Sequence, residues 1–281
     1  MNDLGRREFL RKAFQIGGIA AIHRFGLGAV KDAQAWNILP VIPTMGAAGG
    51  MQEYSAWDEL LENVNVGLCI QATNTSPGGN ETGVSGRGLL SGADLVATQA
   101  GNVPGSDGTK RLLNGVDQRF TLTANALATL LTGTEWTIIG KFTTMNPVDS
   151  DGMFWQFYDS APINIISATA SVGDLSVNLD DDDEADATVT PTTNLAPSTA
   201  YYIAVWTSAI DGFTRCGYST TLPTKWSDFT SPTTGGQFAA VYDGFSAFDD
   251  RQFIGSTTAS FMNVYWHWII LDNTCLIDNA A

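Results

Sequence analysis

Short segments that alternate apolar and polar residues recur along the chain, and this period of two constrains the fold more than any other feature. In residues 136–142, for example, Trp136, Ile138 and Phe142 fall on one face of an extended chain. Similar segments follow at short, regular intervals, with no intervening helical pattern long enough for a parallel sheet. The pattern predicts many short strands and an antiparallel β-sandwich.

The predicted strands are separated by turn residues. After residue 136 they span 153–158, 163–170, 175–179, 188–192, 201–207, 237–242, 251–256 and 261–271. The clearest hairpin joins 206–210 to 213–219 through Asp211-Gly212, a pair that accepts the positive φ angles of a type I′ turn. The last strand carries an apolar row predicted to face the core, and this row consists of Met262, Val264, Trp266, Trp268 and Ile270.

Charge divides the chain into a short basic head and an acidic body. Residues 1–35 hold six basic and three acidic side chains, although the 281-residue chain has a formal charge of −15. This balance argues against nucleic acid as a partner, because binding to phosphates needs lysine and arginine. A basic head followed by an apolar stretch at 13–22 is typical of a targeting segment.

Residues 6–12 resemble the twin-arginine export signal, in which paired arginines precede Phe-Leu. Arg6 and Arg7 are the pair, and Phe9 and Leu10 follow them. The resemblance implies cleavage after Ala35, at the end of a small-x-small triplet, and a periplasmic, cell-surface or secreted protein that meets the membrane only through this signal. The alternative interpretation is an amphipathic N-terminal helix.

The sequence therefore predicts three parts. Residues 1–35 are the signal peptide, and residues 36–63 are a linker or strap with a short helix at 55–62. Residues 64–281 form a single β-rich domain, in which no internal repeat is found.

Four phrases in this domain resemble successive strands of concanavalin A-like (laminin-G-like) jelly rolls. They lie at 112–122, 135–142, 201–206 and 253–272, and a short helix at 124–131 fits between the first two. The resemblance implies an all-β fold, a two-sheet antiparallel jelly-roll sandwich with one or two short helices. This scaffold is used for sugar binding, protein adhesion or glucan cleavage, so the fold alone does not decide the function.

The sequence favours a protein without catalytic activity. Glucanases on this scaffold resemble one another in a Glu-x-Asp-x-x-Glu strand, which is absent here. The acidic run 180–184 is interpreted as a solvated turn, with a calcium-binding loop as the alternative. His267 is the only imidazole after residue 35, and its position within a strand favours a half-buried structural role over that of a general base.

The best candidates for ligand contact are aromatic and acidic residues in predicted loops, where aromatic side chains are not needed for packing. The first pair is Trp226 and Asp228, and the second group is Tyr242, Asp243 and Asp250. We expect them to bind a glycan or a surface protein, with Trp226 as the stacking platform. The alternative is that these aromatic side chains close the edge of the sandwich.

Two further features are weaker. Asp149 and Asp151 have the spacing that opens a calcium loop, although a simple Asp-Gly turn explains the same residues, and Ca²⁺ is the one cofactor considered. Cys69 lies on an early strand and Cys275 near the end, and terminal strands often adjoin in jelly rolls. A disulfide between them is therefore expected as one alternative in an oxidising compartment.

Two other functions stay open. One is a structural subunit of a surface layer or phage-type particle, in which residues 1–54 would be an interaction arm and the chain would self-assemble. The other is a divergent glycoside hydrolase, which would need carboxylates that the sequence pattern does not reveal.

Overall fold

The structure is a computed structural model. It describes residues 66–148, 151–158, 165–171, 174–180, 187–192, 195–207, 214–221, 237–238, 248, 252–256 and 261–276. These residues all belong to one compact unit that spans Glu53–Ala281. The predicted signal peptide and the predicted helix at 55–62 lie outside the described residues.

The described strands form two antiparallel sheets, as predicted. Neighbouring strands of the first sheet run in the order β2 (Glu81–Val84), β1 (Leu68–Gln71), β15 (Asn263–Asp272), β6 (Trp136–Thr144), β11 (Ala200–Thr207), β12 (Thr214–Ser219) and β13 (Gln237–Phe238), and β4 (Arg111–Asn114) pairs with the start of β15. The second sheet runs in the order β3 (Val96–Ala100), β5 (Arg119–Thr121), β14 (Phe253–Ile254), β7 (Asp151–Tyr158), β8 (Ile165–Ser171), β9 (Asp174–Asp180) and β10 (Ala187–Thr192).

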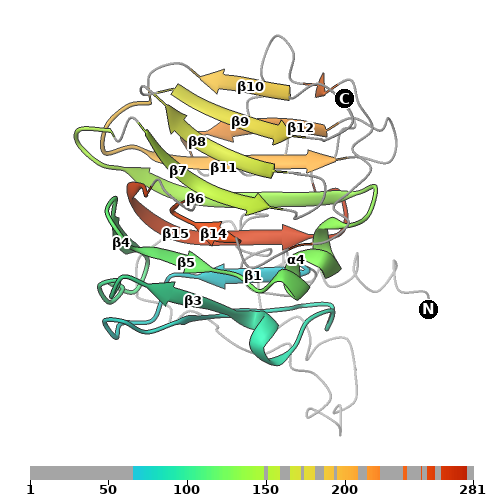
Figure 1. Cartoon of the computed structure of the whole chain (residues 1–281), viewed down its shortest axis with the longest axis horizontal. Helices are drawn as coiled ribbons and strands as arrows, with labels where there is room; N and C mark the ends of the chain where they lie inside the picture. Colours follow the sequence, from blue (N-terminus) through green and yellow to red (C-terminus); the bar gives the residue numbers. More distant parts are fainter. Residues whose placement is uncertain are drawn as a thin grey trace, which may run out of the picture. The chain divides into compact units, whose positions relative to one another are not determined.

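The sheets are stacked face to face and joined along one edge. Figure 1 shows β7, β8 and β9 lying across β6, β11 and β12. At the joined edge β2 pairs with β3, through Glu81 opposite Ala97 and Thr82 opposite Val96. The fold is thus the all-β, two-sheet sandwich expected from the alternating pattern.

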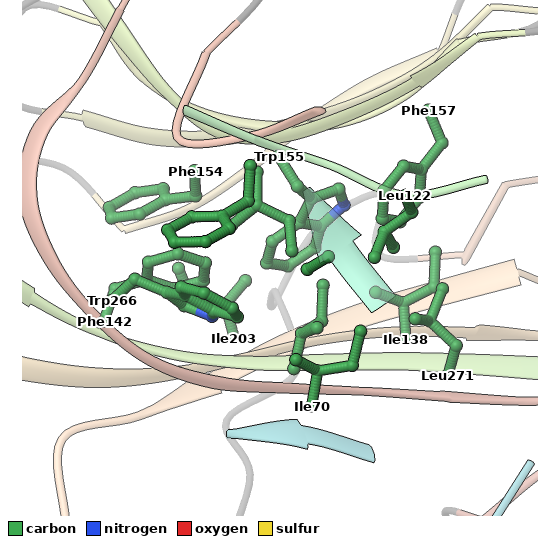
Figure 2. Close-up of a cluster of buried hydrophobic side chains, with 14 of the residues drawn as sticks. Ile70, Leu122, Ile138, Phe142, Phe154, Trp155, Phe157, Ile203, Trp266 and Leu271 are labelled. Atoms are coloured by element: carbon green, nitrogen blue, oxygen red, sulfur yellow. The ribbon is translucent and has the colours of Figure 1, made fainter. Parts of the chain in front are cut away.

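Large apolar side chains from both sheets fill the space between them. Phe142 of β6 meets Phe154 and Trp155 of β7, with ring centroids 4.9 Å and 5.9 Å apart, and all three are fully buried (Figure 2). Gly140 makes room for this contact, because a Cβ there would lie 3.1 Å from the Trp155 ring and 2.5 Å from Phe142. Aromatic pairs of this kind stabilise a core by about 0.5–1.5 kcal/mol beyond the burial of their area.

The last strand, β15, contains a β-bulge at His267, which changes the residues that face the core. Trp266 is opposite Phe142, but the next pairing with β6 is made by Trp268, opposite Lys141. The predicted apolar row is therefore correct only up to Trp266, because the extra residue reverses the alternation. Beyond the bulge the core-facing residues are Ile269 and Leu271, and the residues buried on the outer face are Trp268 and Ile270.

One α-helix and one 3₁₀-helix accompany the described strands. The α-helix α4 spans Ala124–Leu131, as the sequence resemblance implied, and the Thr123 hydroxyl caps it by accepting from the Ala126 N–H at 3.3 Å. Its apolar face buries Leu127, Leu130 and Leu131 in the core. The 3₁₀-helix η2 spans Gly92–Leu95. In the part of the chain that the structure describes, neither helix is long and apolar enough to cross a membrane.

The antiparallel pairing predicted between 206–210 and 213–219 is confirmed where these segments are described, at 206–207 and 214–219. β11 and β12 pair antiparallel from Tyr202 opposite Ser219 to Thr207 opposite Thr214. The Asp211-Gly212 turn between them lies outside the described residues.

Candidate functional site

The loop residues predicted to contact a ligand are not placed by the structure. Trp226, Asp228, Tyr242, Asp243 and Asp250 all lie outside the described residues. Their role in binding stays a prediction.

The predicted calcium residues are placed only in part. Asp149 lies outside the described residues, and Asp151 begins β7, where its backbone pairs with Ser171. Within the part of the chain that the structure describes, no group of three or more histidine, cysteine, aspartate or glutamate side chains is arranged to hold a metal ion.

The disulfide predicted between Cys69 and Cys275 is not formed. The first and last described strands do adjoin as expected, because Cys69 of β1 pairs with Ile270 of β15, and both cysteines belong to one cluster on the outer face of the first sheet. Cys69 acts there as a small apolar side chain. Burial raises the pKa of its thiol to about 12, only partly opposed by a hydrogen bond with Gln71.

The outer face of the first sheet is divided into an apolar half and a polar half. The apolar half is buried and consists of Val66, Cys69, Ile139, Tyr202, Ala204, Trp206, Trp268 and Ile270. Beside it lies a group of half-buried side chains, which we name the outer patch: Lys110, Lys141, Thr143, Tyr265 and His267. The outer patch combines an aromatic ring, two ammonium groups and an imidazole on one sheet face.

Strand register brings the outer patch together. Tyr265 of β15 is directly opposite Thr143 of β6, and Lys141 lies two residues before Thr143 on the same face. The bulge then adds His267 beside them, where its Nε2 is 2.8 Å from the Thr143 hydroxyl oxygen. Lys110 enters from the residue before β4, whose Leu112 is opposite Tyr265.

Both lysines lie over tyrosine rings. The Lys110 Nζ is 4.4 Å from the centroid of the Tyr265 ring, and the Lys141 Nζ is 5.0 Å from that of Tyr202. Contacts of this kind contribute about 0.5–1 kcal/mol at exposed sites. They hold each ammonium group close to the sheet surface.

His267 is neutral at physiological pH. Burial is the largest cause that lowers its pKa, to about 4, and the positive charges of Lys141 and Lys110 lower it further. The negative charge of Asp107 and a hydrogen bond with the Thr109 backbone oppose this shift. The ring therefore adds hydrogen-bonding capacity to the outer patch without adding charge.

A compact loop positions Lys110. One carboxylate oxygen of Asp107, Oδ1, accepts from the Thr109 hydroxyl at 2.8 Å, the Thr109 N–H at 2.9 Å and the Lys110 N–H at 3.1 Å. These bonds, first of all that from the Thr109 hydroxyl, lower the pKa of Asp107. The Ser106 hydroxyl donates its one proton to the Ala72 carbonyl, with the Lys110 carbonyl oxygen 3.0 Å away, and so fixes the loop to the end of β1.

Behind this loop lies a buried ion pair between Arg111 and Glu81. The Arg111 Nη1 is 3.0 Å from the Glu81 Oε1, and both side chains are almost completely excluded from solvent. The Glu81 carboxylate also accepts from the backbone N–H groups of Thr73 and Asn74, at 3.0 Å and 2.9 Å. Each charge is thus paired and hydrogen-bonded, as a buried charge requires.

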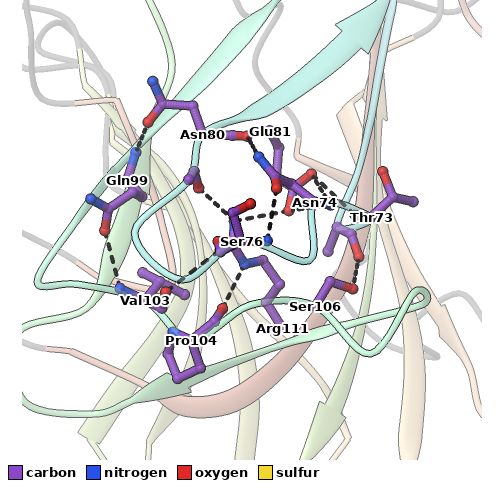
Figure 3. Close-up of polar contacts among 12 residues, drawn as sticks. Thr73, Asn74, Ser76, Asn80, Glu81, Gln99, Val103, Pro104, Ser106 and Arg111 are labelled. Atoms are coloured by element: carbon purple, nitrogen blue, oxygen red, sulfur yellow. Dashed lines mark hydrogen bonds and ion pairs between the residues drawn. The ribbon is translucent and has the colours of Figure 1, made fainter.

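Arg111 also binds the backbone of two loops. Its guanidinium donates to the carbonyls of Pro104 at 2.8 Å, Ser76 at 2.8 Å and Gly79 at 2.6 Å (Figure 3). The loop that contains Ser76 and Gly79 continues from the end of β1, where the Ala72 N–H donates to the His267 carbonyl at 2.8 Å. Arg111 therefore holds the two loops together, and the loop after β1 is bonded to the bulge that carries His267.

Asp272, another buried carboxylate, is also bound by an arginine. It accepts from Arg87 at 2.5 Å and from the Gly67 N–H at 2.6 Å. Like Glu81, it neutralises a guanidinium and ties backbone segments together. Both carboxylates thus have a structural explanation.

The sequence did not identify the outer patch as a site. The alternation places Tyr265 and His267 on the face opposite the apolar row, and Lys141 on the face opposite Trp136, but it does not connect the two strands. Two features of the sequence point to the patch. Lys141 is a charged residue within a largely apolar strand, and Lys110 ends the loop at 101–110.

No protein-family model matches the sequence, and no curated protein matches it. The fold is similar to that of the receptor-binding domain of a botulinum neurotoxin C/D mosaic serotype, with a TM-score of 0.50 and 8% identity over 75% of this chain and 48% of that one. This chain thus spans about half the length of the toxin domain. A more distant structure is a Ruminococcus gnavus sialidase CBM40 bound to α2,3-sialyllactose, with a TM-score of 0.37 and 10% identity over 50% of this chain and 77% of that one. Another is that of domains LG4-5 of the mouse laminin α1 chain, with a TM-score of 0.37 and 9% identity over 50% of this chain and 36% of that one. At these identities the likeness is one of fold.

Proposed function

We propose that the chain is a non-catalytic carbohydrate-binding domain and that the outer patch is its sugar-binding surface. The observation that carries the proposal is the Tyr265–Lys110 contact beside Lys141 and the His267–Thr143 pair, on one half-buried sheet face. Ring surface, ammonium groups and a neutral imidazole are the groups that contact the apolar faces and hydroxyls of a sugar. The toxin domain with the similar fold is described as receptor-binding, which is a binding role on the same scaffold.

The structure of the patch supports binding better than turnover. The ionisable groups of the outer patch are two lysines, a tyrosine and a histidine. The carboxylate whose charge affects the pKa of His267 is that of Asp107. Glycoside hydrolysis normally needs a pair of carboxyl groups on either side of the bond. The divergent hydrolase is therefore the less favoured alternative.

A glycan array with the purified chain, followed by calorimetry on the retained glycans, tests this proposal. We expect the Tyr265→Ala variant to bind at least about tenfold more weakly, because truncation of a central aromatic contact costs more than 1 kcal/mol. Tyr158→Ala, a half-buried tyrosine of the second sheet, is the matched control and should bind normally. If no glycan is retained, carbohydrate binding is refuted. If Tyr265→Ala binds as well as the wild type, the site lies elsewhere.

We also propose that the domain is exported through the signal at Arg6 and Arg7. The mature protein from the native cell should then begin at Trp36, which intact mass spectrometry measures directly. An intact Met1 on the mature protein would contradict export and favour the assembly alternative.

A further inference from the structure

We infer that the outer patch binds an acidic sugar unit, one that carries a carboxylate or a sulfate group. This inference rests on the proposed function and names the class of glycan that the patch selects. It follows from where the chain places two of its few cationic side chains.

The positive charge of the patch contrasts with the rest of the chain. The protein has a formal charge of −15 and contains only five lysines, two of which are Lys110 and Lys141. They are 31 positions apart in the sequence, because Lys110 lies directly before β4 and Lys141 lies on β6. Both charges nevertheless act on the His267 ring. The fold thus gathers like charges around one point, at an electrostatic cost that an anionic ligand would remove.

The lysines differ from the arginines nearby in how their charge is used. Arg111 and Arg87 each form a salt bridge with a buried carboxylate. Within the described part of the chain neither Lys110 nor Lys141 forms a salt bridge, and each is held over a tyrosine ring instead. A lysine ammonium has three N–H donors, and a ring below it leaves donors that point away from the sheet.

Asp107 offsets only part of this charge. Its Oδ1 is occupied by the three bonds from Thr109 and Lys110, and His267 is neutral, so two lysines against one aspartate leave a net charge of +1. The patch can therefore donate to an anionic group from its lysines. Tyr265 and the Thr143–His267 pair lie beside it to contact the ring and hydroxyls of the same sugar.

Paired probes test the inference. Polygalacturonate and its methyl ester differ in the carboxylate, and dextran sulfate and dextran differ in the sulfate. We expect calorimetry to detect binding of at least one acidic polymer at low salt, weaker binding at high salt, and at least about tenfold weaker binding of its neutral counterpart. The arm that binds more tightly identifies the acidic group.

Charge variants assign the effect to the patch. Lys110→Gln and Lys141→Gln should each weaken binding of the acidic polymer about tenfold. Arg119→Gln removes one positive charge from β5 of the second sheet and should leave binding unchanged. Thermal unfolding of each variant checks that the fold is intact.

The outcomes separate this inference from the proposed function. If the array retains neutral glycans through Tyr265 and the lysine variants bind them normally, the acidic-sugar inference is refuted while carbohydrate binding stands. If Arg119→Gln weakens binding as much as the lysine variants, the attraction is general and the inference is also refuted. If neither acidic polymer binds better than its neutral partner, the inference fails for both acidic groups.

Discussion

The guanidinium of Arg111 lies 3.0 Å from the carboxylate of Glu81, and both side chains are excluded from solvent. The pair connects β4 to β2, at the edge where the two sheets join, and so stabilises the loops that carry Lys110. We expect Arg111→Met to lower the free energy of unfolding by about 3–5 kcal/mol, because it leaves the Glu81 charge buried without its partner.

Urea denaturation measures this loss, and Arg87→Met is the matched control. Arg87 pairs with Asp272, but its own side chain is 30% exposed, so its removal should cost less. The double variant Glu81→Leu/Arg111→Met should recover part of the stability, because it leaves no unpaired charge. An Arg111→Met protein as stable as the wild type would contradict this account of the loops.

Gly105→Ala should destabilise the protein by about 1–3 kcal/mol, the usual cost of overpacking. A Cβ at Gly105 would lie 2.0 Å from the Thr75 carbonyl oxygen, so the two loops held by Arg111 would have to separate. Gly133→Ala is the control, because its Cβ would meet no atom closer than 3.6 Å and should change stability by less than about 0.5 kcal/mol. Equal midpoints of the two variants in urea would show that the loops do not touch here.

His267 makes the stability of the protein depend on pH between 6.5 and about 4. Its pKa is lowered from 6.5 to about 4 in the folded chain, so within this window the unfolded chain binds a proton that the folded chain does not. Stability should therefore fall as the pH decreases from 6.5 to 4, and this contribution should level off below 4.

The measurement compares wild type with His267→Gln, in urea titrations at pH 7.5 and pH 4.5. Because carboxylates contribute to acid sensitivity in both proteins, the difference between them isolates the histidine. The variant should lose less stability on acidification. If the two proteins lose the same amount, the imidazole is accessible to protons in the folded state.

The cysteines should be reduced, and two of them should be unreactive in the folded protein. Burial raises the pKa of the Cys69 and Cys216 thiols to about 12, so very little thiolate is present at pH 7.5. We expect N-ethylmaleimide to modify neither thiol before unfolding. After unfolding without a reductant it should modify all three cysteines, as read by mass spectrometry. A product with only one modified cysteine would reveal a disulfide.

Much of the fold could be predicted because alternation is a local property. The strand predicted at 136–142 is seen at Trp136–Thr144, and that predicted at 201–207 is seen at Ala200–Thr207. The bulge at His267 could not be predicted, because Trp266, Trp268 and Ile270 are all apolar and both faces of the first sheet are buried in this region. When neither face is polar, the sequence does not indicate where the alternation reverses.

The outer patch is hard to predict for a different reason. Lys110 and Lys141 are brought together by pairing between strands that are distant in the sequence, and one sequence contains no sign of that register. The prediction therefore relied on local clusters in loops, such as that around Trp226. Local clusters are visible in a sequence, whereas a surface that crosses β4, β15 and β6 appears only when the strands are paired.

The position of β15 determines when the domain can form during synthesis. This strand lies at the centre of the first sheet and pairs with β1, β4 and β6, although it is the last of the described strands in the sequence. A nascent chain on the ribosome therefore has a gap between β1 and β6 until Asp272 has left the exit tunnel. Before that moment the edges of both strands are open to other chains, so the newly made polypeptide depends on rapid completion or on chaperones to avoid aggregation.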